Sequence, residues 1–139
     1  MSRFSLSIEN GIKNAEAARK NLDEINSIFD ELSQEIKLKT GGEVSFERAS
    51  LGFLVEFANS SPDRSSKKKR GRLVLRSKKG NETNLAKWEQ AADGYPFVIE
   101  FDGKRNDCWD EEGLIGVLGD IISTGYFWLE VNKLLPTEE

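Results

Sequence analysis

The chain contains no histidine, and this absence excludes several kinds of catalytic site. Histidine is the most common general base and the most common metal ligand, so Ser-His-Asp and Cys-His arrangements cannot be built. Cys108 is the single cysteine, which excludes an internal disulfide and a zinc site made of several Cys or His ligands. Any chemistry would therefore depend on carboxylates, lysine, tyrosine or a metal bound by oxygen ligands.

Long apolar segments are missing as well. No apolar run approaches the roughly 18 residues of a membrane span, and residues 1–10 lack the apolar block typical of a signal peptide. Together with the single cysteine, these absences predict a cytoplasmic protein that does not enter a membrane. The length of 139 residues, with 37% hydrophobic and 32% charged residues, is typical of one globular domain. We therefore expect a single domain over residues 1–139.

Charge is unevenly distributed along the chain, although the net charge is only −4. Residues 60–90 contain ten Lys/Arg and three Asp/Glu, whereas residues 100–139 contain three Lys/Arg and ten Asp/Glu. Either the basic and acidic surfaces partly neutralise each other in the fold, or each faces a partner.

Helical periodicity marks the N-terminal third. Apolar residues recur at alternating spacings of three and four, typical of one face of an amphipathic helix; they are Ala15, Ala18, Leu22, Ile25, Phe29, Leu32 and Ile36. With Asn14 as N-cap and Gly41-Gly42 as stop, we expect a helix over residues 15–38. At about 1.5 Å per residue it would be roughly 36 Å long. One end should therefore project beyond a small sheet or pair with another copy, giving a monomer or a homodimer through this helix.

After this helix, apolar and polar residues alternate as in β-strands. We expect two short strands or one bent strand over residues 44–58, with a turn at residues 47–50, and a further strand over residues 73–76. The segment 59–71 is rich in Ser, Lys and Arg without a large apolar residue, which predicts a mobile basic loop. Leu85 and Trp88 are spaced by three and predict a short helix.

The segment FVIEFDGKRNDC, residues 97–108, predicts a β-hairpin. Asp102-Gly103 is a preferred sequence for a two-residue type I′ turn, because both turn residues need positive φ. This turn places Phe97 opposite Cys108 and aligns opposite charges on the other face of the hairpin, where cross-strand pairs contribute about 0.2–1 kcal/mol each.

Helical spacing returns in the C-terminal quarter. Asp110, Glu111 and Glu112 form an acidic first turn, which favours a helix N-terminus, and a second helix follows after Ser123-Thr124-Gly125. Three glycines spaced by three within the first helix suggest close packing of another helix or of Trp109; they are Gly113, Gly116 and Gly119. The element order predicts an α+β fold: an antiparallel sheet of about five strands, with the long N-terminal helix and the C-terminal helices on one face.

One pattern suggests an enzyme. Pro62-Asp63, followed by Asp102 and Lys104, resembles the PD-(D/E)xK signature of restriction nucleases, where two acidic residues hold Mg²⁺ and the lysine orients the attacking water. However, Asp63 would lie in the expected loop, and Gly103 is a turn residue rather than the middle of a strand. The hairpin interpretation is favoured, and we expect a protein without catalytic residues, metal or cofactor.

The favoured function is binding of another protein. Residues 126–129 are four consecutive large apolar residues, YFWL, and one helix cannot bury all four, so at least one should be exposed. Exposed Trp and Tyr near carboxylates are typical of interface anchors. We expect a small non-enzymatic protein of the inhibitor, immunity-protein or adaptor type, which presents an acidic surface with aromatic residues to a basic protein, for example a nuclease or another toxin. The expected contacts are Asp107, Asp110, Glu111, Glu112, Tyr126 and Trp128.

The alternative is nucleic-acid binding that does not depend on sequence, through the basic segment 67–79. This segment has no aromatic residue on which single-stranded bases could stack, and the acidic pI of about 5.1 argues against it. The residues that would carry this function are Lys67, Lys68, Lys69, Arg70, Arg72, Arg76, Lys78 and Lys79.

Overall fold

The computed structural model describes residues 3–50 and 69–136, which form three helices and one five-stranded sheet. Every strand is antiparallel to its neighbour in the chain, so the sheet is a meander in the order β1-β2-β3-β4-β5. The elements are α1 (Ser5–Lys39), β1 (Val44–Ser50), β2 (Lys69–Ser77), β3 (Glu82–Gln90), β4 (Phe97–Phe101), β5 (Lys104–Cys108), α3 (Glu111–Ile122) and α4 (Gly125–Leu134).

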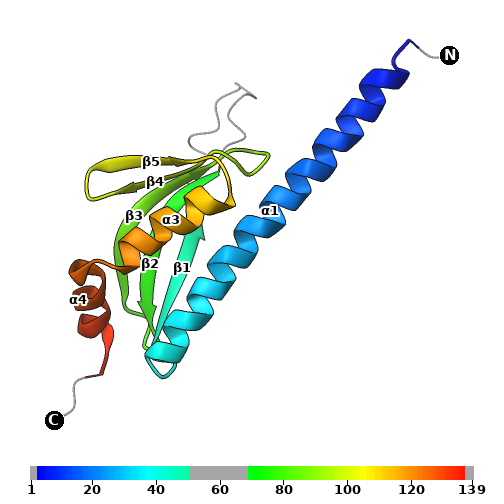
Figure 1. The fold of residues 1–139 in the computed structure, drawn as a ribbon. Helices are drawn as coiled ribbons and strands as arrows, with labels where there is room; N and C mark the ends of the chain where they lie inside the picture. The colour runs from blue at the N-terminus through cyan, green and yellow to red at the C-terminus, as the bar shows by residue number, and fades with distance from the viewer. Residues whose placement is uncertain (1–2, 51–68, 137–139) are drawn as a thin grey trace, which may run out of the picture.

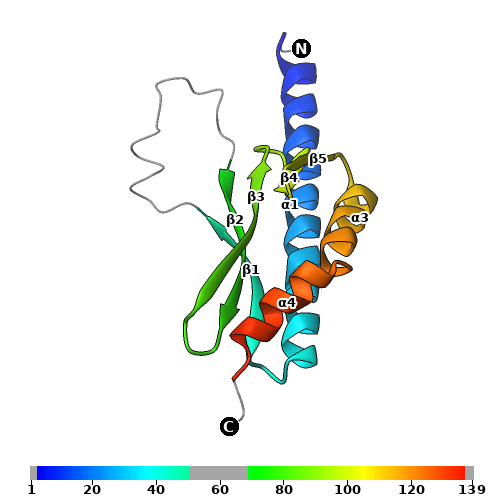
Figure 2. The same ribbon diagram turned by 90° about the vertical axis from the view of Figure 1, so that its left-hand side faces the viewer.

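The described helices all lie on one face of the sheet, and none of them covers its other face (Figures 1 and 2). Helix α1 lies along β1, α3 packs near β4 and β5, and α4 crosses near β2. This arrangement confirms the predicted α+β fold, with about five antiparallel strands and helices on one face.

The core lies between the helices and the inner face of the sheet. Phe97 is fully buried and contacts Phe29 of α1 and Trp88 of β3, with ring centroids 5.4 and 5.6 Å apart. Phe46 of β1 contacts both Phe29 and Phe127 of α4 at 6.4 and 6.1 Å. Aromatic side chains from all parts of the chain therefore join the helical layer to the sheet.

Helix α1 begins ten residues earlier than the sequence predicted, at Ser5 instead of residue 15. Asn14 lies inside the helix and is not its N-cap. Every described residue before Ala18 is exposed, and this half of α1 extends past the sheet (Figure 1). The expected projection is thus confirmed, and it is longer than expected: 35 residues at about 1.5 Å each span roughly 52 Å.

The hairpin prediction is confirmed residue by residue. β4 and β5 pair Phe97 with Cys108 and Phe101 with Lys104, and every pair between them has the predicted register. Asp102 and Gly103 both have positive φ, 53° and 76°, as a type I′ turn requires.

Three expectations in the middle of the chain are wrong. Residues 83–88 belong to strand β3 and not to a helix. Residues 47–50 continue β1 instead of forming a turn. The expected mobile loop is too long at its C-terminal end, because β2 begins at Lys69; the rest of it, residues 59–68, lies outside the described residues.

A β-bulge explains why residues 83–88 resembled a helix. The register between β2 and β3 shifts between Leu73, opposite Ala86, and Val74, opposite Asn84, so Leu85 has no partner directly opposite. Because of this extra residue, both Leu85 and Ala86 are buried, and the strand loses its simple alternation.

The C-terminal helices are as predicted, but the close packing of another helix or of Trp109 against the glycines of α3 is not found. The Asp110 carboxylate caps α3 by accepting a hydrogen bond from the Gly113 backbone N–H at 2.8 Å. No other described element packs closely against Gly116 or Gly119, since a Cβ built on either would meet no atom within 4 Å, and a Cβ at Gly113 would meet Asp110 and Cys108 instead of another helix or Trp109. Trp109 is 68% exposed.

Within residues 3–50 and 69–136, no single helix has the length and apolar character needed to cross a membrane. The pair α3 and α4 meets these criteria only when the two are taken together, and they are bent by 66° at the break between them.

Candidate functional site

The acidic and aromatic residues expected to form one surface lie at opposite ends of α3. Asp110, Glu111 and Glu112 are at its start, whereas Tyr126 and Trp128 belong to α4, which follows its end. The 12 residues of α3 separate the two groups by roughly 18 Å. Asp107 is on β5, where it pairs with Arg105 at 3.1 Å. The structure therefore does not bring the predicted contacts together in one patch.

Of the two aromatic residues, Tyr126 is the more accessible, with 49% of its surface exposed. Trp128 is half-buried: its indole N–H donates to the Ile122 carbonyl at 2.7 Å, and its ring packs edge-on against Phe127. These contacts join α4 to the end of α3. Tyr126 and Leu129 are exposed, as expected of at least one residue in the YFWL stretch.

The acidic start of α3 instead lies beside an acidic face of α1. The neighbouring Glu24 carboxylate, with smaller contributions from burial and from Glu112, raises the pKa of Glu111. Glu24 is positioned by the Tyr95 hydroxyl, which donates to its Oε1 at 2.7 Å. The structure thus holds two carboxylates from distant parts of the chain close together.

From this carboxylate pair, two rows of residues run along the facing sides of α1 and α3. Residues spaced by three or four lie on one side of a helix, and the α1 row is Glu24, Ile28, Glu31 and Glu35. The α3 row consists of Glu111, Ile115, Gly119 and Ile122.

Between the two rows lies an apolar groove of about 240 Å³. Isoleucine, leucine and glycine form its walls, and Glu31 and Glu35 are the charged residues in its lining; the full lining is Ile28, Glu31, Leu32, Glu35, Ile115, Leu118, Gly119 and Ile122. Ile115 is 49% exposed. We call this feature the α1–α3 groove.

The carboxylates of the two rows are not neutralised within the described residues. None of these four carboxylates forms an ion pair with Lys or Arg in that part of the chain; they are Glu24, Glu31, Glu35 and Glu111. Residues 21–36 contain five Asp/Glu and no Lys/Arg, and residues 110–122 contain four Asp/Glu and no Lys/Arg. The α1–α3 groove therefore lies in a strongly negative part of the surface.

Sequence reasoning found Asp110, Glu111 and Glu112 but missed the residues contributed by α1. One available signal was the one-sided charge of residues 21–36. Another was Ile28, an apolar residue outside the predicted apolar stripe. The pairing of α1 with α3 could not be inferred from either signal, because it depends on how both helices lie on the sheet.

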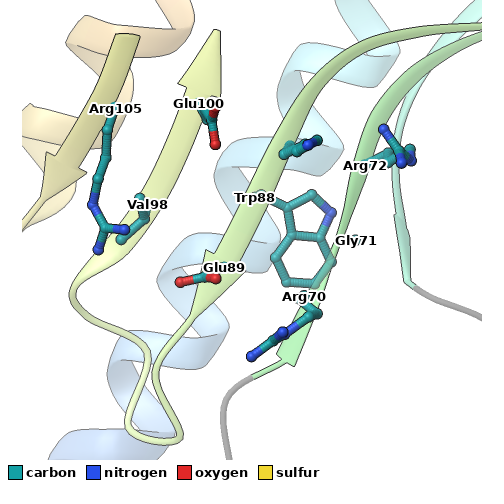
Figure 3. A pocket seen from close by; sticks show the side chains of 9 residues that line it. Arg70, Gly71, Arg72, Trp88, Glu89, Val98, Glu100 and Arg105 are labelled. Carbon is teal, nitrogen blue, oxygen red and sulfur yellow. The ribbon is translucent and has the colours of Figure 1, made fainter. Parts of the chain in front are cut away.

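The outer face of the sheet carries the second candidate site. A hollow of about 320 Å³ lies over β2 to β5 (Figure 3). Its charged lining consists of Arg70, Arg72, Lys87, Arg105, Glu89 and Glu100. Across the strands, Arg70 is opposite Glu89 and Glu100 is opposite Arg105, whereas Arg72 is opposite Lys87. Cations and carboxylates therefore alternate over most of this hollow.

The other predicted nucleic-acid contacts are spread over the same part of the chain. Arg76 forms ion pairs with Glu47 and Glu82 on the two neighbouring strands. Lys69 is exposed in β2, Lys78 and Lys79 are exposed in the turn after β2, and Lys67 and Lys68 lie outside the described residues.

A third charged feature, Arg48, faces the core. Its guanidinium lies over the rings of Phe29, Trp88 and Phe97, with the nearest centroid, that of Phe29, at 4.8 Å. It donates hydrogen bonds to the side-chain oxygens of Gln90 and Asn26. Burial lowers the pKa of Arg48, and Asp30 acts in the opposite direction. Its contacts join α1, β1 and the sheet.

The nuclease pattern gains no support from the geometry. Asp102 and Lys104 are exposed at the hairpin turn, and Asp63 lies outside the described residues. Over residues 3–50 and 69–136, no three Asp, Glu, Cys or His side chains converge as ligands of a metal ion.

Comparison of the chain with protein-family models, with curated proteins and with solved structures finds no match.

Proposed function

We propose that this protein is a small, non-enzymatic binding protein that presents the negative α1–α3 surface to a basic protein partner. The carrying observation is that the Glu24 carboxylate lies close enough to Glu111 to raise the pKa of Glu111, and that neither residue forms an ion pair with Lys or Arg in the described chain. Like charges held together cost stability unless a partner supplies the opposite charge. Lys or Arg side chains of a bound protein would supply it.

The apolar groove beside these carboxylates supports the same proposal. Protein interfaces typically combine a desolvated apolar centre with a polar rim. Here aliphatic side chains line the groove, and Glu31 and Glu35 lie at its edge. Cytoplasmic inhibitors, immunity proteins and small adaptors bind their partners through surfaces of this kind. By analogy, we place this protein among these functional classes.

The test is affinity capture from native lysate treated with nuclease, comparing charge-reversal variants on the two faces. The variant Glu31→Lys with Glu35→Lys reverses the charge of the α1–α3 groove. The control Glu89→Lys with Glu100→Lys makes the same charge change on the outer face of the sheet. We expect wild type and control to retain one basic protein in near-stoichiometric amount, and the groove variant to lose it.

Equal recovery of that protein by all three forms would contradict the proposal. Recovery of no basic protein by the wild type would contradict it as well. Both variants change exposed or rim positions, so thermal unfolding should confirm that each is folded before capture.

Nucleic-acid binding is the second candidate, and one observation favours it: within the described residues, Arg70, Arg72 and Lys87 line the outer hollow without forming ion pairs. Phosphate contacts of this type weaken steeply between about 50 and 200 mM salt. The same control variant separates the two functions, because Glu89→Lys with Glu100→Lys would strengthen nucleic-acid binding and leave the basic protein partner unaffected.

A further inference from the structure

We infer that the α1–α3 groove binds one amphipathic α-helix of the basic partner, with the helix's aliphatic side chains in the groove and its Lys/Arg side chains beside Glu31 and Glu35. This inference rests on the proposed function and specifies which structural element of the partner is recognised.

The size and lining of the groove favour side chains of a protein over a small molecule. Its volume of about 240 Å³ is below the roughly 300–1,000 Å³ of typical small-molecule pockets. Apart from Glu31 and Glu35, no lining side chain offers a hydrogen-bonding group that could orient a polar ligand. A row of aliphatic side chains from a helix matches both features.

Gly119 is the position where the groove is open for such a helix. A Cβ added there would meet no atom within 4 Å, so no contact within the described protein requires this residue to be glycine. Gly119 lines the groove, whereas Gly116, one turn earlier on α3, does not. The absence of a side chain at Gly119 lets the backbone of a neighbouring helix come close to α3, since small residues permit close approach.

The walls of the groove also decide what kind of element fits. Two helices form both sides, and a third helix packs its side-chain ridges into the grooves between theirs. None of the described residues that line this site belongs to a strand, so an extended peptide would find no backbone partner among them to continue a sheet.

Charge disfavours the projecting part of α1 from a second copy of this chain as the occupant. The exposed large apolar residues of α1 are Leu6, Ile8, Ile12 and Leu38. Of these, Ile8 and Ile12 lie one turn apart on the same side of the helix. On the helix surface, Glu9 and Glu16 are immediate neighbours of Ile12. In the groove, these carboxylates would lie near Glu31 and Glu35, which repel them. A helix with Lys or Arg in those flanking positions gains attraction instead.

Three synthetic helical peptides of about four turns test the inference. The first carries Leu at i, i+3, i+4 and i+7 with Lys on both flanks. The second keeps Leu but has Glu on the flanks, and the third keeps Lys but has Ser in place of Leu. Amide chemical shifts of the full-length, ¹⁵N-labelled protein report where each peptide binds. We expect only the first peptide to bind, with the largest shifts at Leu32, Ile115 and Gly119.

Two matched glycine variants then test the groove itself. Gly119→Gln places a polar side chain in the groove without changing charge, and Gly116→Gln makes the same change one turn away. We expect Gly119→Gln to weaken the first peptide at least tenfold and Gly116→Gln to leave its affinity within about twofold.

Each other outcome overturns the inference. If the first peptide causes no shift at millimolar concentration, or causes shifts away from the groove, either result contradicts it. Equal binding of the Glu-flanked peptide, or equal effects of the two glycine variants, also contradicts it. Shifts that appear without peptide as protein concentration rises would assign the groove to a second copy. If Gly119→Gln still captures the basic protein from lysate, the helix in the groove is excluded while the proposed function stands.

Discussion

The two faces of the sheet differ in how their side chains are stabilised. On the inner face, large apolar residues such as Phe46, Trp88 and Phe97 are buried under the helices. On the outer face, charged residues stand beside opposite charges on neighbouring strands, as Arg76 does between Glu47 and Glu82. Burial of apolar area contributes roughly 25 cal/mol per Å², whereas exposed ion pairs contribute about 0–1 kcal/mol. Stability should therefore come almost entirely from the inner face.

The carboxylates beside the α1–α3 groove resemble neither face. They are charged like the outer face, but none of them forms an ion pair within the described residues, whereas on the outer face Arg76 and Arg105 do. An ion pair within the fold explains why its two charged residues are present. Like charges that lie together without an ion pair have no such structural explanation. This contrast is the reason for proposing that a partner binds on the helical side of the molecule.

The strongest test of the contrast compares two positions on strand β4. Phe97 is fully buried on the inner face, whereas Glu100 is exposed on the outer face. Phe97→Ala should lower the free energy of unfolding by about 3–5 kcal/mol, because it removes a large ring and leaves a cavity. Glu100→Ala should change it by at most about 0.5 kcal/mol. Urea denaturation followed by circular dichroism measures both.

If Phe97→Ala cost less than about 1 kcal/mol, the core beneath α1 would have to be far looser than the ring contacts indicate. If Glu100→Ala cost as much as Phe97→Ala, the outer face would contribute to stability in a way that exposed charges do not explain.

A buried thiol on the inner face gives a second test, through pH. Cys108 is 1% exposed, and burial, with smaller effects of Asp107 and Asp110, raises its pKa to about 11. The thiol ionises near pH 8.5 in the unfolded chain, so the unfolded state loses a proton that the folded state keeps. The free energy of unfolding should therefore fall as the pH rises from about 8.5 to 11, by up to about 3 kcal/mol.

Cys108→Ala provides the control, since it removes the thiol and keeps the other groups that titrate in this range. The difference between wild type and variant should be constant below pH 8 and then decrease steadily as the pH rises. A difference that does not change with pH would mean that the folded thiol ionises as easily as the unfolded one.

Local sequence rules predicted the elements whose geometry depends on a few neighbouring residues. The Asp102-Gly103 turn determines every pair between β4 and β5, so one dipeptide was enough to predict the full hairpin register. Asp110 caps α3 for the same kind of local reason. The start of α1 was not predictable in this way, because its N-cap Phe4 makes no side-chain capping hydrogen bond.

Contacts between distant segments could not be predicted from the sequence. The bulge opposite Leu73 and Val74 depends on how β2 and β3 pair, and it gave Leu85 and Trp88 a false helical spacing. The meeting of Glu24 with Glu111 depends on how α1 and α3 pack on the sheet. The sequence therefore predicted the acidic residues at the start of α3, Asp110 to Glu112. The acidic residues contributed by α1 appeared in the sequence only as an unexplained excess of negative charge.

Arg48 and Arg72 sharpen the comparison between faces, because they are the same residue type on opposite sides. Arg48 lies over three aromatic rings on the inner face and donates to Gln90 and Asn26; Arg72 is exposed on the outer face. Lysine keeps the charge but lacks the planar group that stacks and donates in two directions. Arg48→Lys should cost roughly 1–2 kcal/mol of unfolding free energy, and Arg72→Lys less than about 0.5 kcal/mol. Equal effects in thermal denaturation would show that Arg48 behaves as a surface cation.

The smallest expected effect belongs to the outer-face ion pairs of Arg76. Its guanidinium lies 2.6 Å from Glu47 and also contacts Glu82, but the side chains are 41%, 37% and 44% exposed, so water screens the attraction. A double-mutant cycle with Arg76→Met and Glu82→Gln should give a coupling energy of about 0.2–1 kcal/mol. The coupling should decrease in 1 M salt, where the Debye length is about 3 Å. A coupling energy above about 2 kcal/mol that persists in salt would mean that ion pairs on the outer face also stabilise the fold substantially.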